Sequence, residues 1–181
     1  MKSHILISIR ITFALLVITC GIYPLAVWAI GQAAFRDQAN GSLIRRNGRV
    51  IGSELIGQSF TSERFFHPRP SSSNYDPSAS GGTNLGPTSA KLRDSIASAV
   101  KAYDIHTNVP ADAVTASCSG VDPHISPANA AAQAPRVARA NNLPLAEVRR
   151  LIARHTEERW LGVYGEPRVN VLLLNLELAH R

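Results

Sequence analysis

The hydrophobic pattern begins with one long apolar run. From Ile11 to Phe35 there are 25 consecutive residues without Asp, Glu, Lys or Arg. At about 1.5 Å per residue, a helix over this run would be roughly 37 Å long, which exceeds the hydrocarbon core of a bilayer. The pattern therefore predicts that residues 1–35 form an N-terminal transmembrane anchor and that residues 36–181 form a separate, water-facing domain.

A cleaved signal peptide is the alternative for this run. Lys2 and Arg10 resemble the basic region of such a peptide, and Ala29 supplies a small residue before a cleavage point. The apolar region of a signal peptide is about 7–15 residues long, whereas this run continues past Ala29 to Phe35. Its length favours a retained anchor.

Beyond the anchor the pattern changes to short segments. Pieces rich in β-branched residues between glycines predict a hairpin or two short strands over residues 48–60. A helix with Pro87 in its first turn is predicted by apolar residues at helical spacing, namely Leu92, Ile96, Val100 and Tyr103. Residues 113–118 are expected to form a short strand after a turn.

The C-terminal third adds two helices and a strand. Ser126 and Pro127 predict the start of a helix that runs through Arg139 and is bent or interrupted at Pro135. A further helix is expected from Pro144 to about residue 159, with one apolar stripe. Residues 168–178 are apolar on both alternating faces, which predicts a central strand. The expected fold is one compact α+β domain behind a single N-terminal transmembrane helix.

A long loop rich in proline interrupts this pattern. Residues 66–87 contain four prolines and three glycines, so neither a helix nor a strand can run through them. Loops of this length are usually functional or disordered. The large apolar residues Phe65, Phe66, Tyr75 and Leu85 are anchors that a disordered linker would not need, and we therefore expect a functional loop.

Composition excludes several classes of function. The chain of 181 residues is 45% hydrophobic and 18% charged, which suits a folded domain, and its net charge is +6. The arginines of the predicted helices alternate with glutamates and lack an aromatic series, so no nucleic-acid partner is expected. Neither a phosphate-binding glycine loop nor a metal-binding His or Cys spacing occurs, and we expect no metal site.

Two small groups of residues could carry chemistry. Asp122 and His124 could touch a common ion, but Asp122-Pro123 also predicts a turn capped by the carboxylate, which is the favoured interpretation. Ser117 and Ser119 are possible nucleophiles, although the Gly-x-Ser-x-Gly motif is absent. A membrane-anchored periplasmic serine hydrolase is therefore the alternative function.

Seven strings follow one another along the chain and together carry a resemblance. They are GSELIGQSF at 52–60, FHPRPS at 66–71 followed by Tyr75, GTNLGP at 82–87, PADAVTAS at 110–117, GVDPHISP at 120–127, Gln133 with PRVA at 135–138, and GEPRVNVLLLN at 165–175. In this order they resemble the C subunit family of the Kdp potassium-importing P-type ATPase. Cys118 departs from the family pattern, which more often has Gly or Ala there.

The resemblance implies a place in a four-part membrane complex. A channel-like subunit binds potassium, a P-type subunit hydrolyses ATP through an aspartyl phosphate, and a small single-span peptide assists them. This chain would be the non-catalytic fourth member, single-pass in the plasma (inner) membrane. Its N-terminus would be cytoplasmic, and its C-terminal domain would be periplasmic, against the channel-like subunit.

The family resemblance also implies a catalytic chaperone, which raises the ATP affinity of the hydrolysing subunit through a ternary complex with nucleotide. No cofactor is expected to bind to this chain alone, and potassium would be handled by the partner subunits. Because the domain lies across the membrane from cytoplasmic ATP, such an effect requires coupling through those subunits. The nucleotide-related candidates are Ser119, Gly120 and Gln133, and the alternative for Gln133 is a helix residue bonded to a neighbouring loop.

The docking surface is expected on the proline-rich loop and on the final strand region. Phe66 and Tyr75 are the large side chains that could anchor a partner, and Arg69 is the candidate charged contact unless it only faces solvent. The full set of docking candidates is Phe66, His67, Arg69, Tyr75, Asn84, Asp122 and His124.

Overall fold

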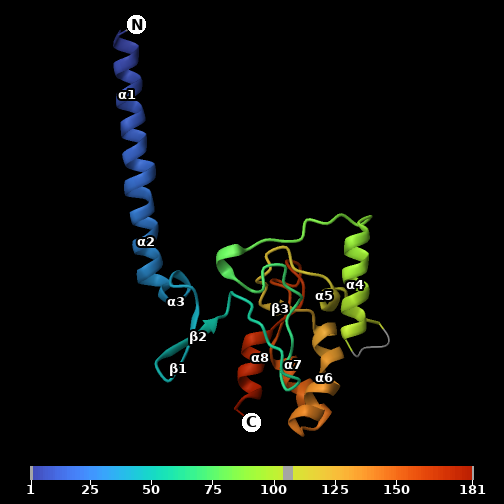
Figure 1. The fold of residues 1–181 in the computed structure, drawn as a ribbon. Coiled ribbons are helices and arrows are strands. Elements are labelled where there is room, and N and C mark those ends of the chain that lie inside the picture. Colours follow the sequence, from blue (N-terminus) through green and yellow to red (C-terminus); the bar gives the residue numbers. More distant parts are fainter. Residues whose placement is uncertain (1, 104–107, 181) are drawn as a thin grey trace. The chain divides into compact units, whose positions relative to one another are not determined.

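The computed structural model describes residues 2–103 and 108–180. It divides into two compact units, Met1–Leu43 and Ile44–Arg181, which are described separately (Figure 1). The division lies a few residues beyond the end of the apolar run, because a short polar helix belongs with the first unit.

The first unit is a long helix followed by a short one. It comprises α1 (Lys2–Leu16), the π-helix η1 (Val17–Ile22), α2 (Tyr23–Ala34) and α3 (Arg36–Ala39). By length and composition, Ser3–Ala34 could cross a membrane. The helix therefore begins before the apolar run and takes in Arg10. Tyr23 N donates to Ile18 O, a step of five residues that marks the π turn.

A β-hairpin follows, in a different place from the one predicted. Strands β1 (Leu43–Arg46) and β2 (Arg49–Ser53) are joined by Asn47 and Gly48, both with positive φ, as a type I′ turn requires. The second strand lies within the predicted range of residues 48–60, but the first lies before it, because Gly48 was taken as a boundary, whereas Asn-Gly is the hairpin turn itself. Residues 54–60 form turns and irregular chain.

The helices of the second unit are capped largely by serine and asparagine. They are α4 (Ala90–Ala102), α5 (Ala111–Val114), α6 (Pro127–Asn141), α7 (Leu145–Arg154) and α8 (Val171–Leu178), with a 3₁₀ turn η2 at Pro77–Ala79. Ser126 Oγ accepts from Asn129 N, which confirms the predicted start of α6. Ser89 caps α4, so Pro87 lies outside that helix and its predicted first-turn position is wrong.

Three short antiparallel strands form a small sheet in the order β3-β5-β4. They are β3 (His124–Ile125), β5 (Arg168–Asn170) and β4 (Thr156–Glu157). Val169 of the central strand pairs with Ile125 on one side and with Thr156 on the other. Because the chain turns into β4 at Thr156, α7 ends at Arg154, before the predicted end near residue 159.

Two other strand predictions were wrong over most of their length. The expected strand at 168–178 is a strand only to Asn170, whose side chain then caps α8 by accepting from Leu173 N at 3.2 Å. A leucine run that is buried on several sides fits a helix as well as a strand, so periodicity alone could not decide. Within the predicted strand at 113–118, the first two residues belong to α5 and the rest is irregular.

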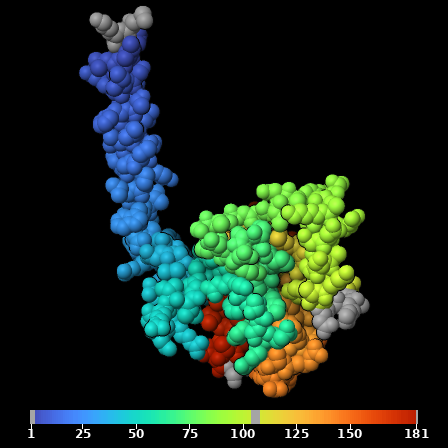
Figure 2. Space-filling view, in the orientation of Figure 1, coloured from blue at the N-terminus to red at the C-terminus, as the bar shows by residue number. Residues whose placement is uncertain are grey.

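The hydrophobic core lies where α6, α7, β5 and α8 meet. Its largest members include Phe66, Ile125, Leu151, Val169 and Leu174, all with at most 2% of their surface exposed. The expected α+β class is confirmed for the residues described. The proline-rich loop runs over the surface of this unit, and the green region of Figure 2 lies directly against the rest of the domain.

Candidate functional site

Two buried amide side chains bind the segment that leads into the proline-rich loop. Asn175 of α8 accepts from Phe66 N at 2.8 Å and donates to Phe66 O at 2.9 Å. Gln133 of α6 makes the same pair of contacts with His67, at 2.7 Å from His67 N and 3.0 Å to His67 O. Each amide thus occupies both main-chain polar groups of one residue, as a neighbouring strand would.

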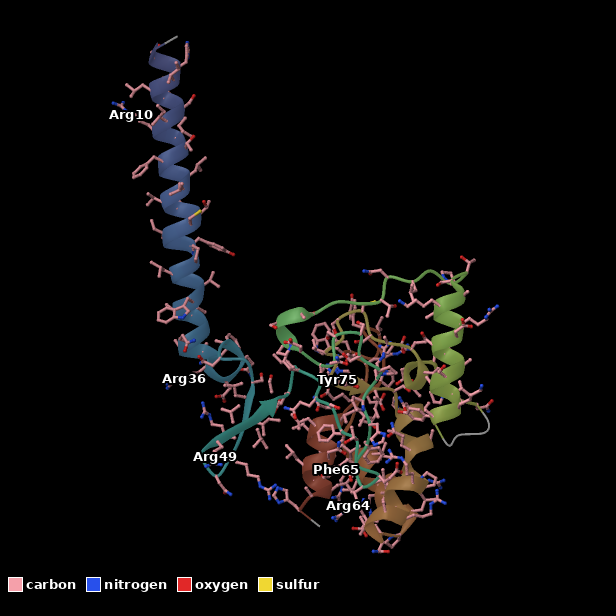
Figure 3. The ribbon with its side chains drawn as sticks, viewed as in Figure 1. Arg10, Arg36, Arg49, Arg64, Phe65 and Tyr75 are labelled. Atoms are coloured by element: carbon pink, nitrogen blue, oxygen red, sulfur yellow. The ribbon has the colours of Figure 1, made fainter. Side chains whose placement is uncertain are left out.

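The same segment is bound along its length by α6. Asn141 donates to Arg64 O at 2.7 Å and accepts from Arg64 Nε at 3.1 Å. Arg136 donates to Glu63 O and to Phe65 O, at 2.7 and 3.0 Å. We call residues 63–67 the clamped segment; Figure 3 labels Arg64 and Phe65 within it.

Gln133 is the centre of a polar network. Its Nε2 also donates to Asn129 Oδ1 at 2.9 Å, and its Oε1 also accepts from Arg136 at 2.8 Å. Asn129 in turn donates to Asp112, which accepts from the N-cap Ser126 as well. A primary amide has two donor hydrogens and two acceptor lone pairs, so the hydrogen-bonding capacity of Gln133 is fully used.

A cavity of about 550 Å³ opens beside this network. Its polar lining comes from Glu63, His67, Tyr103, Gln133, Arg136 and Arg139. Burial and the neighbouring Arg136 charge lower the pKa of His67, against the opposing effects of the Ser62 carbonyl and of Glu63. Burial likewise lowers the pKa of Arg136 and raises the pKa of Tyr103. Arg136 and Arg139 give the cavity wall positive charge, which Glu63, 3.6 Å from Arg136, partly offsets, and burial disfavours the charged form of His67.

Ser119 and Gly120 bind a different part of the chain from Gln133. Ser119 O accepts from Gly81 N at 2.9 Å, and Gly120 O accepts from Ser71 Oγ at 2.5 Å. Gly120 has a φ of +70°, and a Cβ there would lie 3.0 Å from Gly81 O, so a side chain would be strained. These residues fasten the proline-rich loop, and their contacts are with residues 71–81 rather than with Gln133.

Asp122 links two of the predicted docking residues. It lies 3.3 Å from Arg69 Nη1 and accepts from His124 N at 3.0 Å, which confirms the expected capped turn. Burial alone would raise the pKa of Asp122, but hydrogen bonds from His124 and the charge of Arg69 hold it below the usual value. The three side chains are about one quarter exposed and line a groove of about 500 Å³ together with Asp112, Glu166 and Arg168.

The remaining docking candidates differ in exposure. Tyr75 is half-buried, its hydroxyl donates to Arg69 O at 2.7 Å, and burial raises its pKa to about 12. Asn84 is exposed. Phe66 has no exposed surface and belongs to the core, so the structure does not place its side chain on the surface where a docking anchor was expected. The proline-rich composition predicted the loop, but it gave no sign that Phe66, the first residue of the loop, belongs to the core.

The serines of the alternative function are turn residues here. Ser117 Oγ accepts from Gly120 N at 2.9 Å, and Ser119 Oγ accepts from Val121 N at 3.2 Å. Both contacts are with main-chain amides and hold the 117–121 turn. Over residues 2–103 and 108–180, no group of three or more His, Cys, Asp or Glu side chains is arranged to hold a metal ion.

Three network residues were missed from the sequence. Asn175, Asn129 and Asp112 were not singled out, although two of them are nearly inaccessible to solvent. A polar residue inside an apolar run is the signal that could have found Asn175, since buried amides are retained only where they are bonded.

Comparison with known proteins places this arrangement in a family. The model of the family "KdpC: K+-transporting ATPase, c chain" matches residues 5–180. The potassium-transporting ATPase KdpC subunit of Mycobacterium tuberculosis (strain H37Rv) is 52% identical over 98% of both chains. The KdpC subunits of Gemmatimonas aurantiaca and Koribacter versatilis are 51% and 48% identical over 98% of this chain, and cover 93% and 95% of their own lengths. The chain belongs to the KdpC family.

Proposed function

We propose that this chain is the membrane-anchored, non-catalytic subunit of a potassium-importing P-type ATPase complex. Its N-terminus is cytoplasmic, the helix Ser3–Ala34 spans the plasma (inner) membrane, and residues 44–181 are periplasmic. The observation that carries the proposal is the family match over residues 5–180, which covers the apolar helix and the domain together.

The partners are the channel-like potassium-binding subunit, the ATP-hydrolysing subunit and the small single-span subunit. The groove that contains Arg69, Asp122 and His124 is the proposed contact with the channel-like subunit. These groups are already partly desolvated and fixed by mutual contacts, so little conformational entropy is lost when a partner covers them. Potassium is handled by the partners.

The chaperone effect on ATP affinity is proposed to act through these contacts. Gln133 has no free hydrogen-bonding group for a nucleotide, and Ser119 and Gly120 are committed to the proline-rich loop. ATP is therefore bound by the hydrolysing subunit, in a ternary complex to which this chain adds coupling free energy and no phosphate ligand. Such coupling requires that the chain contact two states of its partners differently.

The test is reconstitution with the partner subunits. The complex is purified in detergent, and the ATP concentration that gives half-maximal hydrolysis is measured with wild-type chain and with Arg69→Ala. We expect the variant to copurify less and to need more ATP. Arg93→Ala is the matched control, because Arg93 is exposed and its salt bridge is with the adjacent Asp94.

Two outcomes would contradict the proposal. One is wild-type ATP dependence in a complex that lacks this chain. The other is esterase activity of the purified chain that is abolished by Ser119→Ala, which would favour the anchored hydrolase.

A further inference from the structure

An exposed apolar turn projects from the small sheet. It lies in the connection between β4 and β5 and carries four large side chains: Trp160, Leu161, Val163 and Tyr164 are 69%, 73%, 72% and 64% exposed. No charged residue lies between Arg159 and Glu166. We call residues 160–164 the aromatic tip. Contiguous apolar side chains held so far into solvent usually mark a contact surface.

The aromatic tip is a closed turn. Trp160 N donates to Tyr164 O at 2.9 Å, and Tyr164 N donates to Trp160 O at 3.0 Å. Val163 N bonds to Trp160 O and Gly162 N to Arg159 O. Leu161 and Gly162 have positive φ, as the two central residues of a type I′ turn require. Most backbone donors of the tip are thus satisfied within it.

The base of the tip carries two ion pairs and one further acidic residue, Glu158. Arg159 pairs with Glu166 at 2.6 Å, and Arg168 pairs with Glu157 at 2.8 Å. One residue beyond Arg168, Val169 is fully buried in the core, so the strands that carry the tip are rooted in the domain. The tip is therefore connected to the core through the paired strands β4 and β5.

We propose that the aromatic tip inserts into the headgroup region of the bilayer that holds the anchor, as a second membrane contact. This inference rests on the proposed membrane anchor. Trp and Tyr have an apolar body and one polar atom, which is why they concentrate at membrane interfaces. Lipid offers no hydrogen-bond partners to backbone N–H and C=O groups. Insertion therefore costs little where these groups are already bonded to each other.

The anchor keeps the second unit close to the membrane. The second unit begins at Ile44, ten residues after the helix ends at Ala34. Ten residues span at most about 36 Å. Because the domain is tethered, insertion is an intramolecular step, and four apolar side chains suffice where a free domain would bind weakly. A lipid surface fits better than a protein partner because Trp160 and Tyr164 are the side-chain types that concentrate at membrane interfaces, and the domain that carries them is already tethered to a bilayer.

The chain offers a direct test because its two tryptophans are Trp28, in the anchor, and Trp160, in the tip. Full-length chain with Trp28→Phe is placed in phosphatidylcholine vesicles that contain lipid with a doxyl quencher high on the acyl chain. We expect at least twofold quenching of Trp160 fluorescence, unaffected by salt. The orientation of the chain in the vesicle does not matter, since the tip follows its own anchor.

Variants separate the tip from the rest of the domain. Adding Leu161→Asp and Val163→Asp should abolish the quenching of Trp160. Adding Leu55→Asp is the matched control, because Leu55 is 57% exposed but lies outside the tip, and quenching should persist.

A reciprocal variant separates failure of the tip from failure of the anchor. Trp160→Phe leaves Trp28 as the probe, and its quenching reports whether the anchor is in the bilayer. If Trp28 is quenched but Trp160 is not, the anchor stands and the inference about the tip is overturned. If Trp28 is not quenched, the anchor is overturned as well. Protection of Trp160 that develops only when partner subunits are added would assign the tip to a protein contact and would also overturn it.

Discussion

Gln133 and Asn175 bind the main chain of adjacent residues, and each does so with the same pair of hydrogen bonds. Gln133 of α6 contacts both polar groups of His67, and Asn175 of α8 contacts both polar groups of Phe66. Two helices thereby hold one extended segment without a strand beside it. Since an unsatisfied buried amide costs more than a single hydrogen bond contributes, the structure depends strongly on both side chains.

The first prediction concerns Gln133. Gln133→Met keeps the volume but leaves His67 N and Asn129 Oδ1 without their partner, so unfolding free energy should fall by about 1–3 kcal/mol for each unsatisfied group. Urea unfolding of the detergent-solubilised chain measures this. Gln38→Met, at an exposed position in α3, should have no effect. Unchanged stability together with lost ATP coupling would instead make Gln133 a nucleotide residue.

Phe66 provides the second prediction. Phe66→Ala should reduce stability by about 3–5 kcal/mol, because it opens a cavity in a core that the side chain fills completely. The neighbouring Phe65→Ala should cost less, since Phe65 is only half-buried and packs edge-on against Phe60. Thermal unfolding compares the two. A stable Phe66→Ala chain that no longer binds its partners would restore the docking role.

The third prediction separates the groove from the core. Arg69→Ala should weaken association with the channel-like subunit about tenfold, equivalent to about 1.4 kcal/mol, while the domain stays folded. Tyr75→Ala should act in the same direction, since it removes the hydroxyl contact with Arg69 O. Leu172→Ala, at a 4% exposed residue of α8, should instead cost about 2–5 kcal/mol of stability. Pull-downs and melting curves on the three variants distinguish these effects; loss of fold in Arg69→Ala would assign the groove to folding.

His67 makes stability depend on pH. Its pKa is lowered in the folded domain, so the unfolded chain takes up a proton first as the pH falls. Stability is therefore complete above the ordinary histidine pKa of about 6.5 and decreases below it. His67→Gln should reduce this loss between pH 7.5 and 5.5, measured as the change in melting temperature. An identical pH dependence in both proteins would contradict the effect of burial.

The last prediction tests the anchor. Leu16→Arg places a charge inside the apolar run and should cost about 2.5–3.5 kcal/mol of insertion free energy near the helix centre. The fraction of the chain recovered in membranes should fall accordingly. A mature N-terminus found after Ala29 would show instead that the run is a cleaved signal peptide.

Sequence patterns were sufficient where one local rule decides the structure. The apolar run predicted the N-terminal helix, and the Ser126-Pro127 pair predicted the start of α6. They failed at residues 171–178, where a helix buried on several sides has no clear periodicity, and at Asn47-Gly48, where the turn signal was missed. The clamp of Gln133 and Asn175 joins residues 66 and 109 positions apart, and no local pattern encodes such a pairing.

The π turn at Val17–Ile22 changes how the two halves of the first unit's long helix face their surroundings. One extra residue within a turn rotates everything beyond it by roughly 100° about the helix axis. Three helical turns further toward the C-terminus, the residue on the same side of the helix as Ala14 is therefore Ala26; in an uninterrupted α-helix it would be Leu25. A helical wheel drawn through the whole span would mix two faces that are out of phase. Deletion of one residue within the π turn, rather than any substitution, is the change that would bring the two halves into a single continuous stripe.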